Sequence, residues 1–232
     1  MKILFKVSGA SVVAALAMAA QTIHAQQTVF ANTNTFKAHF STGSLQVGNE
    51  ITLAGSYRQI NGFAFEYYLP TASGTETADV KFYKNDSTAQ SAGYAAPGTV
   101  IYDSGAFNIG SFGSQSSATL NFAASDFTTG VVVPLTVPLP DTFTWTVQFG
   151  GLGSGEDIGV DLYQPVSIGS APSDMWEFSG GSWGLVTNAT YNLTIGASVS
   201  AVPEPSSFLL LAMGGLLGLA IFAVKRHQAA AR

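Results

Sequence analysis

The chain has 232 residues, no cysteine and a formal net charge of −5, and hydrophobic residues make up 47% of it. Without cysteine it has no disulfide, thiolate zinc site, iron–sulfur cluster or cysteine nucleophile. Residues 26–202 include thirteen acidic and four basic side chains. Because nucleic-acid binding depends on basic side chains that neutralise phosphates, this balance excludes nucleic acid as a partner.

The first 25 residues have the layout of a secretory signal peptide. Lys2 and Lys6 form a positive start, residues 7–20 are mostly small and apolar, and Ala25 is a small residue at the cleavage position. Such a short apolar stretch suits export and removal better than a stable membrane anchor. The sequence therefore predicts that signal peptidase cuts after Ala25 and that the mature chain begins at Gln26.

Period-two alternation dominates residues 26–202, which we interpret as one domain. In the clearest run, Thr142–Phe149, large apolar residues alternate with Thr and Gln, as in a strand with one buried and one wet face. Trp145 lies on the apolar side of this run, so we expect it to be buried. Strands are expected at residues 51–57, 63–69, 80–83, 99–102, 118–122, 131–133, 142–149, 158–162, 183–187 and 191–199, with one helical turn at 123–127.

Gly-, Ser- and Pro-rich turns separate these runs. Short strands at this spacing predict an all-β fold, either an antiparallel β-sandwich or a jelly roll.

The predicted domain has little that suggests catalysis. His39 is its only histidine, and we expect it to be a surface residue. Residues 180–184 match the G-x-S-x-G pattern, but no helix is expected after them, and the only later histidine is His227 in the tail. We therefore expect a non-enzymatic protein.

Acidic and aromatic residues gather between positions 157 and 183. Carboxylates in loops are suitable calcium ligands, and the candidates are Asp157, Asp161, Asp174 and Glu177. Aromatic faces suit stacking on sugar rings, and the candidates are Tyr163, Trp176 and Trp183. The alternative, which we favour, is that the tryptophans fill the core and the acids face solvent, with no cofactor or metal.

The C-terminal tail has a membrane-directed pattern. Phe208–Val224 carries no charge and, at about 1.5 Å per residue, is long enough for a short membrane span. Lys225, Arg226 and Arg232 follow, which predicts a cytoplasmic C-terminus by the positive-inside rule.

The segment Val202-Pro203-Glu204-Pro205 before this stretch completes a recognisable order of parts. Together with the apolar stretch and the basic end, it resembles the PEP-CTERM sorting signal of Gram-negative bacteria. The resemblance implies recognition by an exosortase, transient anchoring in the inner membrane over residues 203–232, loss of the helix, and delivery to the cell surface or extracellular matrix.

Two functional readings follow. The first is a surface-sorted, non-catalytic envelope or matrix protein with exopolysaccharide as a candidate partner, because exosortase systems accompany exopolysaccharide production in the family. The second is a secreted glycan-active enzyme or carbohydrate-binding module on a jelly-roll scaffold. A groove with two facing carboxylates and several rings favours the second reading, whereas a flat Thr/Ser/Gly-rich surface favours the first.

Overall fold

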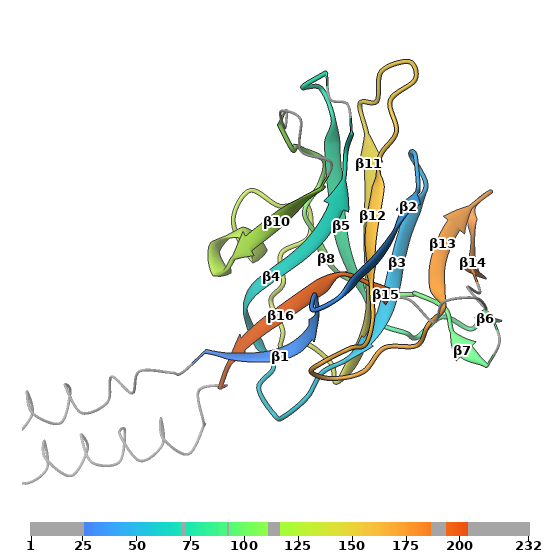
Figure 1. Cartoon of the computed structure of the whole chain (residues 1–232). Coiled ribbons are helices and arrows are strands. Elements are labelled where there is room, and N and C mark those ends of the chain that lie inside the picture. The colour runs from blue at the N-terminus through green and yellow to red at the C-terminus, as the bar shows by residue number, and fades with distance from the viewer. Residues whose placement is uncertain (1–25, 71–72, 92, 111–116, 187–193, 204–232) are drawn as a thin grey trace, which may run out of the picture.

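The computed structural model describes residues 26–70, 73–91, 93–110, 117–186 and 194–203 (Figure 1). The predicted signal peptide at 1–25 lies outside these residues. So do Glu204 and Pro205 of the sorting segment, the apolar stretch 208–224, and the basic residues Lys225, Arg226 and Arg232.

Seven antiparallel strands make up the first sheet: β1 (Gln27–Asn32), β2 (Phe36–Ser41), β4 (Gln59–Tyr68), β10 (Ser117–Ala123), β12 (Gly159–Tyr163), β15 (Thr194–Ile195) and β16 (Ala197–Val202). The long strand β4 pairs with β10, β12 and β16, while β1 pairs with β16 and β2 pairs with β12. Because β4 pairs with three other strands, it is the central strand of this sheet.

The second sheet also has seven strands: β3 (Gln46–Thr52), β5 (Thr77–Tyr83), β8 (Val100–Asp103), β9 (Phe107–Asn108), β11 (Thr142–Gly150), β13 (Met175–Ser179) and β14 (Ser182–Val186). Its order is β14-β13-β3-β11-β5-β8, with β9 also paired to β5. A small hairpin, β6 (Gln90–Ser91) with β7 (Tyr94–Ala95), lies apart from both sheets.

The alternating run that was clearest in the sequence forms β11, which pairs with β3 and β5. The apolar side of β11 is fully covered, and Trp145 is 0% exposed, which confirms its predicted burial. Its polar neighbours Thr144 and Thr146 face the other side of the sheet, yet they are also buried, and their hydroxyls bond to the side chains of Asn85 and Gln46.

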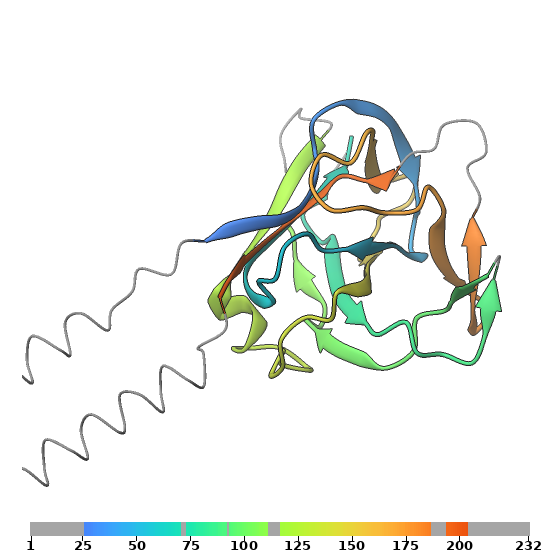
Figure 2. The ribbon, with the colours of Figure 1, turned by 90° about the horizontal axis from the view of Figure 1, so that it is seen from below.

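One hydrophobic core lies between the two sheets. Phe63 of β4 has its ring centroid 5.1 Å from Phe82 of β5 and 5.1 Å from Trp145 of β11, so side chains of the two layers interlock. Burial of such aromatic side chains is the main stabilising contribution in a core of this kind. The prediction of an all-β fold with antiparallel sheets is confirmed, and the two seven-stranded sheets share this core (Figure 2).

Several predicted elements differ from the structure. Residues 131–133 were expected to form a strand, but they make only an isolated bridge between Val133 and Asp103. Two strands before residue 46, β1 and β2, have no counterpart in the prediction. The helical turn expected at 123–127 is present as the 3₁₀ helix η1 (Ala124–Phe127).

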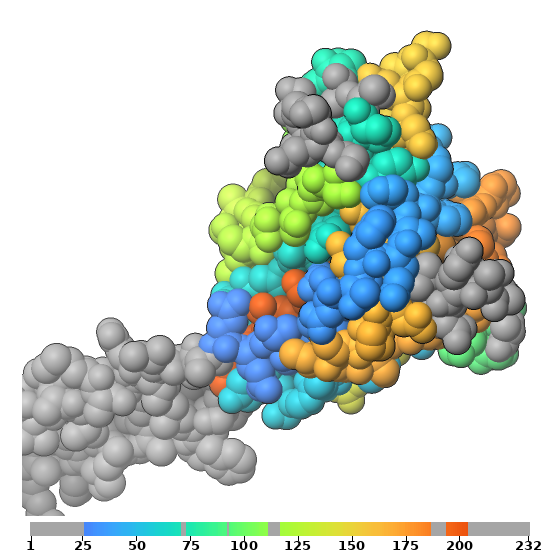
Figure 3. Space-filling model, in the orientation of Figure 1, coloured from blue at the N-terminus to red at the C-terminus, as the bar shows by residue number. Residues whose placement is uncertain are grey.

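The two ends of the described chain lie side by side. Gln27 pairs with Ala201, and both ends leave the molecule at the same corner (Figures 1 and 2). On the face shown in Figure 3, β2 runs across the surface above this corner. The predicted mature N-terminus and the start of the sorting segment are therefore neighbours in the folded protein.

Candidate functional site

The candidate sugar-stacking residues are divided between the two layers. Trp176 and Trp183 belong to the β13–β14 hairpin of the second sheet, whereas Tyr163 is on β12 of the first sheet. The cluster that the sequence placed between residues 157 and 183 is therefore not one site.

Trp183 contributes to a group of three rings on the outer side of the second sheet. Its ring centroid is 5.0 Å from Phe178 across the hairpin and 5.5 Å from Tyr83 of β5. Phe178 is 38% exposed and Trp183 is half-buried, whereas Tyr83 is buried beneath them. We call Phe178, Trp183 and Tyr83 the aromatic platform, and it presents ring surface to solvent.

Trp176 does not belong to this platform. It is 1% exposed and lies in β13 opposite Gly48 of β3. A side chain at position 48 would meet the backbone of Trp145 and Thr146, so β3 and β11 approach each other closely here. In this structure the Trp176 ring is covered and presents no face to a ligand.

A hydrogen-bonded layer beneath the platform holds Tyr83 in place. The Gln46 side-chain amide donates to the Tyr83 hydroxyl at 2.9 Å and to the Thr146 hydroxyl at 2.8 Å. Burial raises the pKa of Tyr83, so the phenol is kept neutral. Nearby, Asn85 donates to Glu50 at 2.8 Å and accepts from Thr144 at 2.8 Å, and burial raises the pKa of Glu50.

Next to this layer, Lys81 binds two carboxylates on the same side of the sheet. Its ammonium is 2.7 Å from Asp103 and 3.2 Å from Asp79. Burial raises the pKa of Asp79. Burial also opposes ionisation of Asp103, but the hydrogen bonds from Lys81 and the Gly105 N–H hold the pKa of this carboxyl below its usual value.

Tyr163 lies on the outer side of the first sheet and is 7% exposed. Its hydroxyl donates to Glu66, and its ring packs edge-on against Phe36 with centroids 5.8 Å apart. Burial, then the bond to Glu66, raises the pKa of this phenol. A hollow of about 440 Å³ beside Tyr163 is lined mainly by the loop that follows β12 and by Thr194.

The four candidate calcium ligands do not form one cluster. Asp157 accepts hydrogen bonds from Ser41 and Tyr68, and Asp161 contacts His39. Glu177 is on β13 of the other sheet, and Asp174 precedes it. Within the described ranges, no group of three or more His, Cys, Asp or Glu side chains could hold a metal ion. The structure therefore does not bring Asp157, Asp161, Asp174 and Glu177 together as a calcium site.

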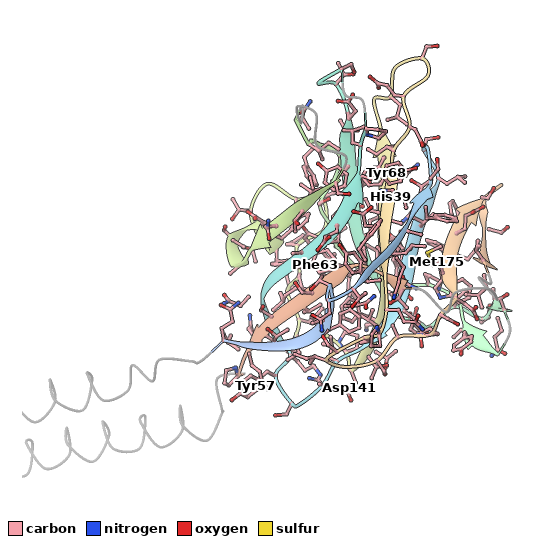
Figure 4. All side chains as sticks on the ribbon, viewed as in Figure 1. His39, Tyr57, Phe63, Tyr68, Asp141 and Met175 are labelled. Carbon is pink, nitrogen blue, oxygen red and sulfur yellow. The ribbon has the colours of Figure 1, made fainter. Side chains whose placement is uncertain are left out.

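His39 has a partner that the sequence did not suggest. Its Nδ1 is 2.6 Å from Oδ1 of Asp161 on the neighbouring strand, and its side chain is 40% exposed, against 1% for Asp161. The centroid of the His39 ring is 4.8 Å from that of Phe36 and 4.6 Å from that of Tyr68, and Figure 4 labels His39 next to Tyr68. The two residues are 122 positions apart in the chain, so only the pairing of β2 with β12 reveals this contact.

The start of the sorting segment is part of the fold. Ala201 and Val202 end β16, and Pro203 is the first residue beyond the strand. In the part of the chain that the structure describes, no helix is long and apolar enough to cross a membrane.

Residues 201–226 match the family model of the PEP-CTERM protein-sorting motif, whereas no curated protein and no solved structure matches the chain. The chain is thus an all-β protein with a C-terminal sorting signal. It carries the PEP-CTERM motif of exosortase substrates, which confirms the resemblance found in the sequence. The motif indicates export, processing by an exosortase and sorting to the cell surface.

Proposed function

We propose that the mature protein is a non-catalytic component of the cell surface or extracellular matrix that associates with exopolysaccharide through the aromatic platform. The observation that supports this most directly is the ring pair of Trp183 and Phe178, 5.0 Å apart and open to solvent at the edge of a sheet.

Ring exposure and rigidity both favour this surface as a sugar contact. Neighbouring exposed rings can mark a contact surface, and a ring can stack on the apolar face of a sugar. Tyr83 supports Trp183 from below and is itself fixed by the Gln46 amide. A platform held in this way loses little conformational entropy on binding.

Glutamate and amide groups nearby could supply the polar contacts that such a ligand needs. Glu50 and Asn85 are both half-buried, and they are joined by a hydrogen bond of 2.8 Å. Sugar hydroxyls would exchange hydrogen bonds with such groups while the rings provide stacking area. The ligand class is therefore a neutral or weakly charged polysaccharide rather than a polyanion, since the domain carries an excess of acidic residues.

The carboxylates on this side of the sheet support a non-catalytic role. Glycosidases place two carboxyl groups roughly 5–9.5 Å apart, on either side of the bond that is cut. Asp79 and Asp103 instead share the Lys81 ammonium, at 3.2 Å and 2.7 Å. Both carboxylates are therefore engaged in an ion-pair cluster, which supports a structural role for them.

The test is retention of the mature protein on the polysaccharide of its own host. We expect Trp183→Ala to abolish retention and Trp183→Phe to keep part of it, because a ring remains. Phe36→Ala is the matched control, since Phe36 is an exposed aromatic residue (45%) on the other sheet. Thermal midpoints of all variants separate lost binding from lost folding.

Equal retention of the wild type, Trp183→Ala and Phe36→Ala would disprove the role of the platform. Release of reducing sugar from the polysaccharide by the wild type would instead support the alternative, a glycan-active enzyme.

A further inference from the structure

We propose that the outer edge of β14 is a self-association surface, on which two copies of this chain pair antiparallel about a two-fold axis at Gly184. The pairing continues the second sheet from one molecule into the next. The inference concerns the edge of the sheet and does not rest on polysaccharide binding.

Strand β14 is the last strand of the second sheet. It pairs with β13 on one side, and among the described residues no strand pairs with its other side. Both views of the ribbon place the β13–β14 hairpin on the side of the molecule opposite the corner where the two chain ends leave (Figures 1 and 2). A second molecule can therefore approach this edge without meeting either end of the described chain.

The turn of the hairpin fixes which backbone groups of β14 face β13. Gly180 and Gly181 form a two-residue turn with φ angles of 60° and 82°, and Ser179 lies opposite Ser182. The two residues that flank such a turn exchange both of their backbone hydrogen bonds. Ser182 therefore directs its N–H and C=O groups to β13.

This bonding alternates along the strand. Gly184 and Val186 also direct their backbone groups to β13, whereas those of Trp183 and Leu185 point to the open edge. In the part of the chain that the structure describes, no strand accepts or donates at these outward groups. They are ready to bind an added strand.

Strand β14 is complementary to itself in the antiparallel orientation. With Gly184 of both copies on the axis, Trp183 of one copy lies opposite Leu185 of the other, and symmetry repeats the pair. These two residues carry the outward groups, so each pair exchanges both of its backbone hydrogen bonds. The indole and the leucine side chain meet on the same face, which adds an apolar cross-strand contact.

The charge of this edge suits a second acidic domain. Strand β14 has no charged residue, proline or bulge, the features by which free edges are usually protected. The nearest acid in the sheet is Glu177, opposite Gly184 on β13. In the joined sheet the two copies of Glu177 are three strand spacings apart, about 14 Å. This separation exceeds the Debye length of about 8 Å at physiological ionic strength, so their repulsion is screened.

The long edge strand β10 is less suited to such pairing. It pairs with β4 alone, and its exposed side chains are Thr119, Asn121 and Ala123, which are small or polar. The Asn121 amide also donates to the Thr119 carbonyl at 3.4 Å. Pairing at β14 instead covers Trp183 and Leu185, which are half-buried in the single molecule.

The joined sheet also determines how the two molecules are oriented. A two-fold axis that relates antiparallel strands of one sheet is perpendicular to that sheet, so both aromatic platforms lie on the same face. The contact is smaller than the roughly 1,200–2,000 Å² of a standard stable interface, and we expect a reversible dimer. Such a dimer presents two platforms to one long ligand.

A single cysteine at the axis tests the register directly. A Cβ at position 184 meets no atom within 4 Å, and the chain has no other cysteine. In the pairing proposed, the two Gly184 Cα atoms are about 4.5 Å apart, within the range of a disulfide. Under mild oxidation the mature Gly184→Cys protein should form a covalent dimer, followed by non-reducing electrophoresis. Ser182→Cys is the matched control, because its two copies lie about 13 Å apart.

Sedimentation velocity of the mature protein over a range of concentrations tests the pairing without a new thiol. We expect the wild type and Leu185→Val to dimerise, and Leu185→Pro to stay monomeric, because proline removes an outward N–H that the single molecule does not use. Thermal midpoints show whether Leu185→Pro remains folded. If it does not, the cysteine comparison decides alone.

Cross-linking of Gly184→Cys no faster than that of Ser182→Cys would overturn the proposal, even if the wild type dimerises, since another surface would then be responsible. A folded Leu185→Pro protein that dimerises like the wild type would overturn it as well. Neither measurement uses polysaccharide, so failure of the platform experiment leaves both unaffected.

Discussion

At the scale of single residues, Trp145 dominates the centre of the core. Its ring centroid is 5.1 Å from Phe63 and 5.4 Å from Phe65, both on the opposite sheet. Trp145→Ala should therefore cost about 3–5 kcal/mol, a large part of the 5–15 kcal/mol that typically stabilises a domain. We expect a steep fall in the thermal midpoint of the mature protein, measured by calorimetry.

Trp145→Phe is the matched comparison. The indole Nε1 is buried and has no hydrogen-bond partner among the described residues, so phenylalanine keeps a ring and removes an unpaired donor. Its midpoint should fall much less than that of Trp145→Ala. If both variants melt like the wild type, Trp145 is not a core residue.

At the scale of elements, Glu76 closes the turn that leads into β5. Its carboxylate accepts the N–H of Gly74 at 2.8 Å and the Ser73 hydroxyl at 3.0 Å, and the residue is 0% exposed. Burial opposes ionisation, but the hydrogen bonds from its own N–H, Ser73 and Gly74 outweigh it and lower the pKa of Glu76.

Because the pKa of Glu76 is lower in the folded than in the unfolded state, its ionised carboxylate stabilises the folded protein at neutral pH and less so in acid. The contribution is complete above the ordinary glutamate pKa of 4.5 and is lost as the pH falls through the lower folded value. Glu76→Gln should therefore lower the thermal midpoint at pH 7, and the difference from the wild type should shrink in acid. A difference that does not change with pH would contradict this.

At the scale of the whole molecule, the domain should not depend on calcium. Its acidic residues engage hydrogen-bond and ion-pair partners in separate places, and the excess of negative charge is a general repulsion that any salt screens. We expect circular dichroism of the mature protein to show the same β spectrum with and without a chelator. Unfolding on chelation, reversed by calcium but not by sodium, would contradict this.

Much of this architecture was predictable because alternation is a local property of the chain. The run at 142–149 predicts β11 and the burial of Trp145, since a strand turns successive side chains to opposite faces. The same rule also applies to β2, where Phe36, Ala38 and Phe40 alternate with Lys37, His39 and Ser41, although no strand was predicted there. The alternation of this run is a signal in the sequence that the prediction missed.

The candidate site was harder to predict, because it depends on which strands become neighbours. Trp176 and Trp183 are seven positions apart, yet one is buried against Gly48 and the other stacks on Phe178. Tyr83, which supports Trp183, is one hundred positions away in the chain. Similarly, His39 meets Asp161 only because β2 and β12 pair.

The sequence by itself determined the all-β class of this protein and its sorting signal, because strand alternation and a sorting motif are both encoded in consecutive residues. Tertiary structure decided which rings are covered and which are presented, which acids are paired, and that the sorting motif begins within a central strand. These features arise from contacts between distant segments, which no local pattern of residues specifies.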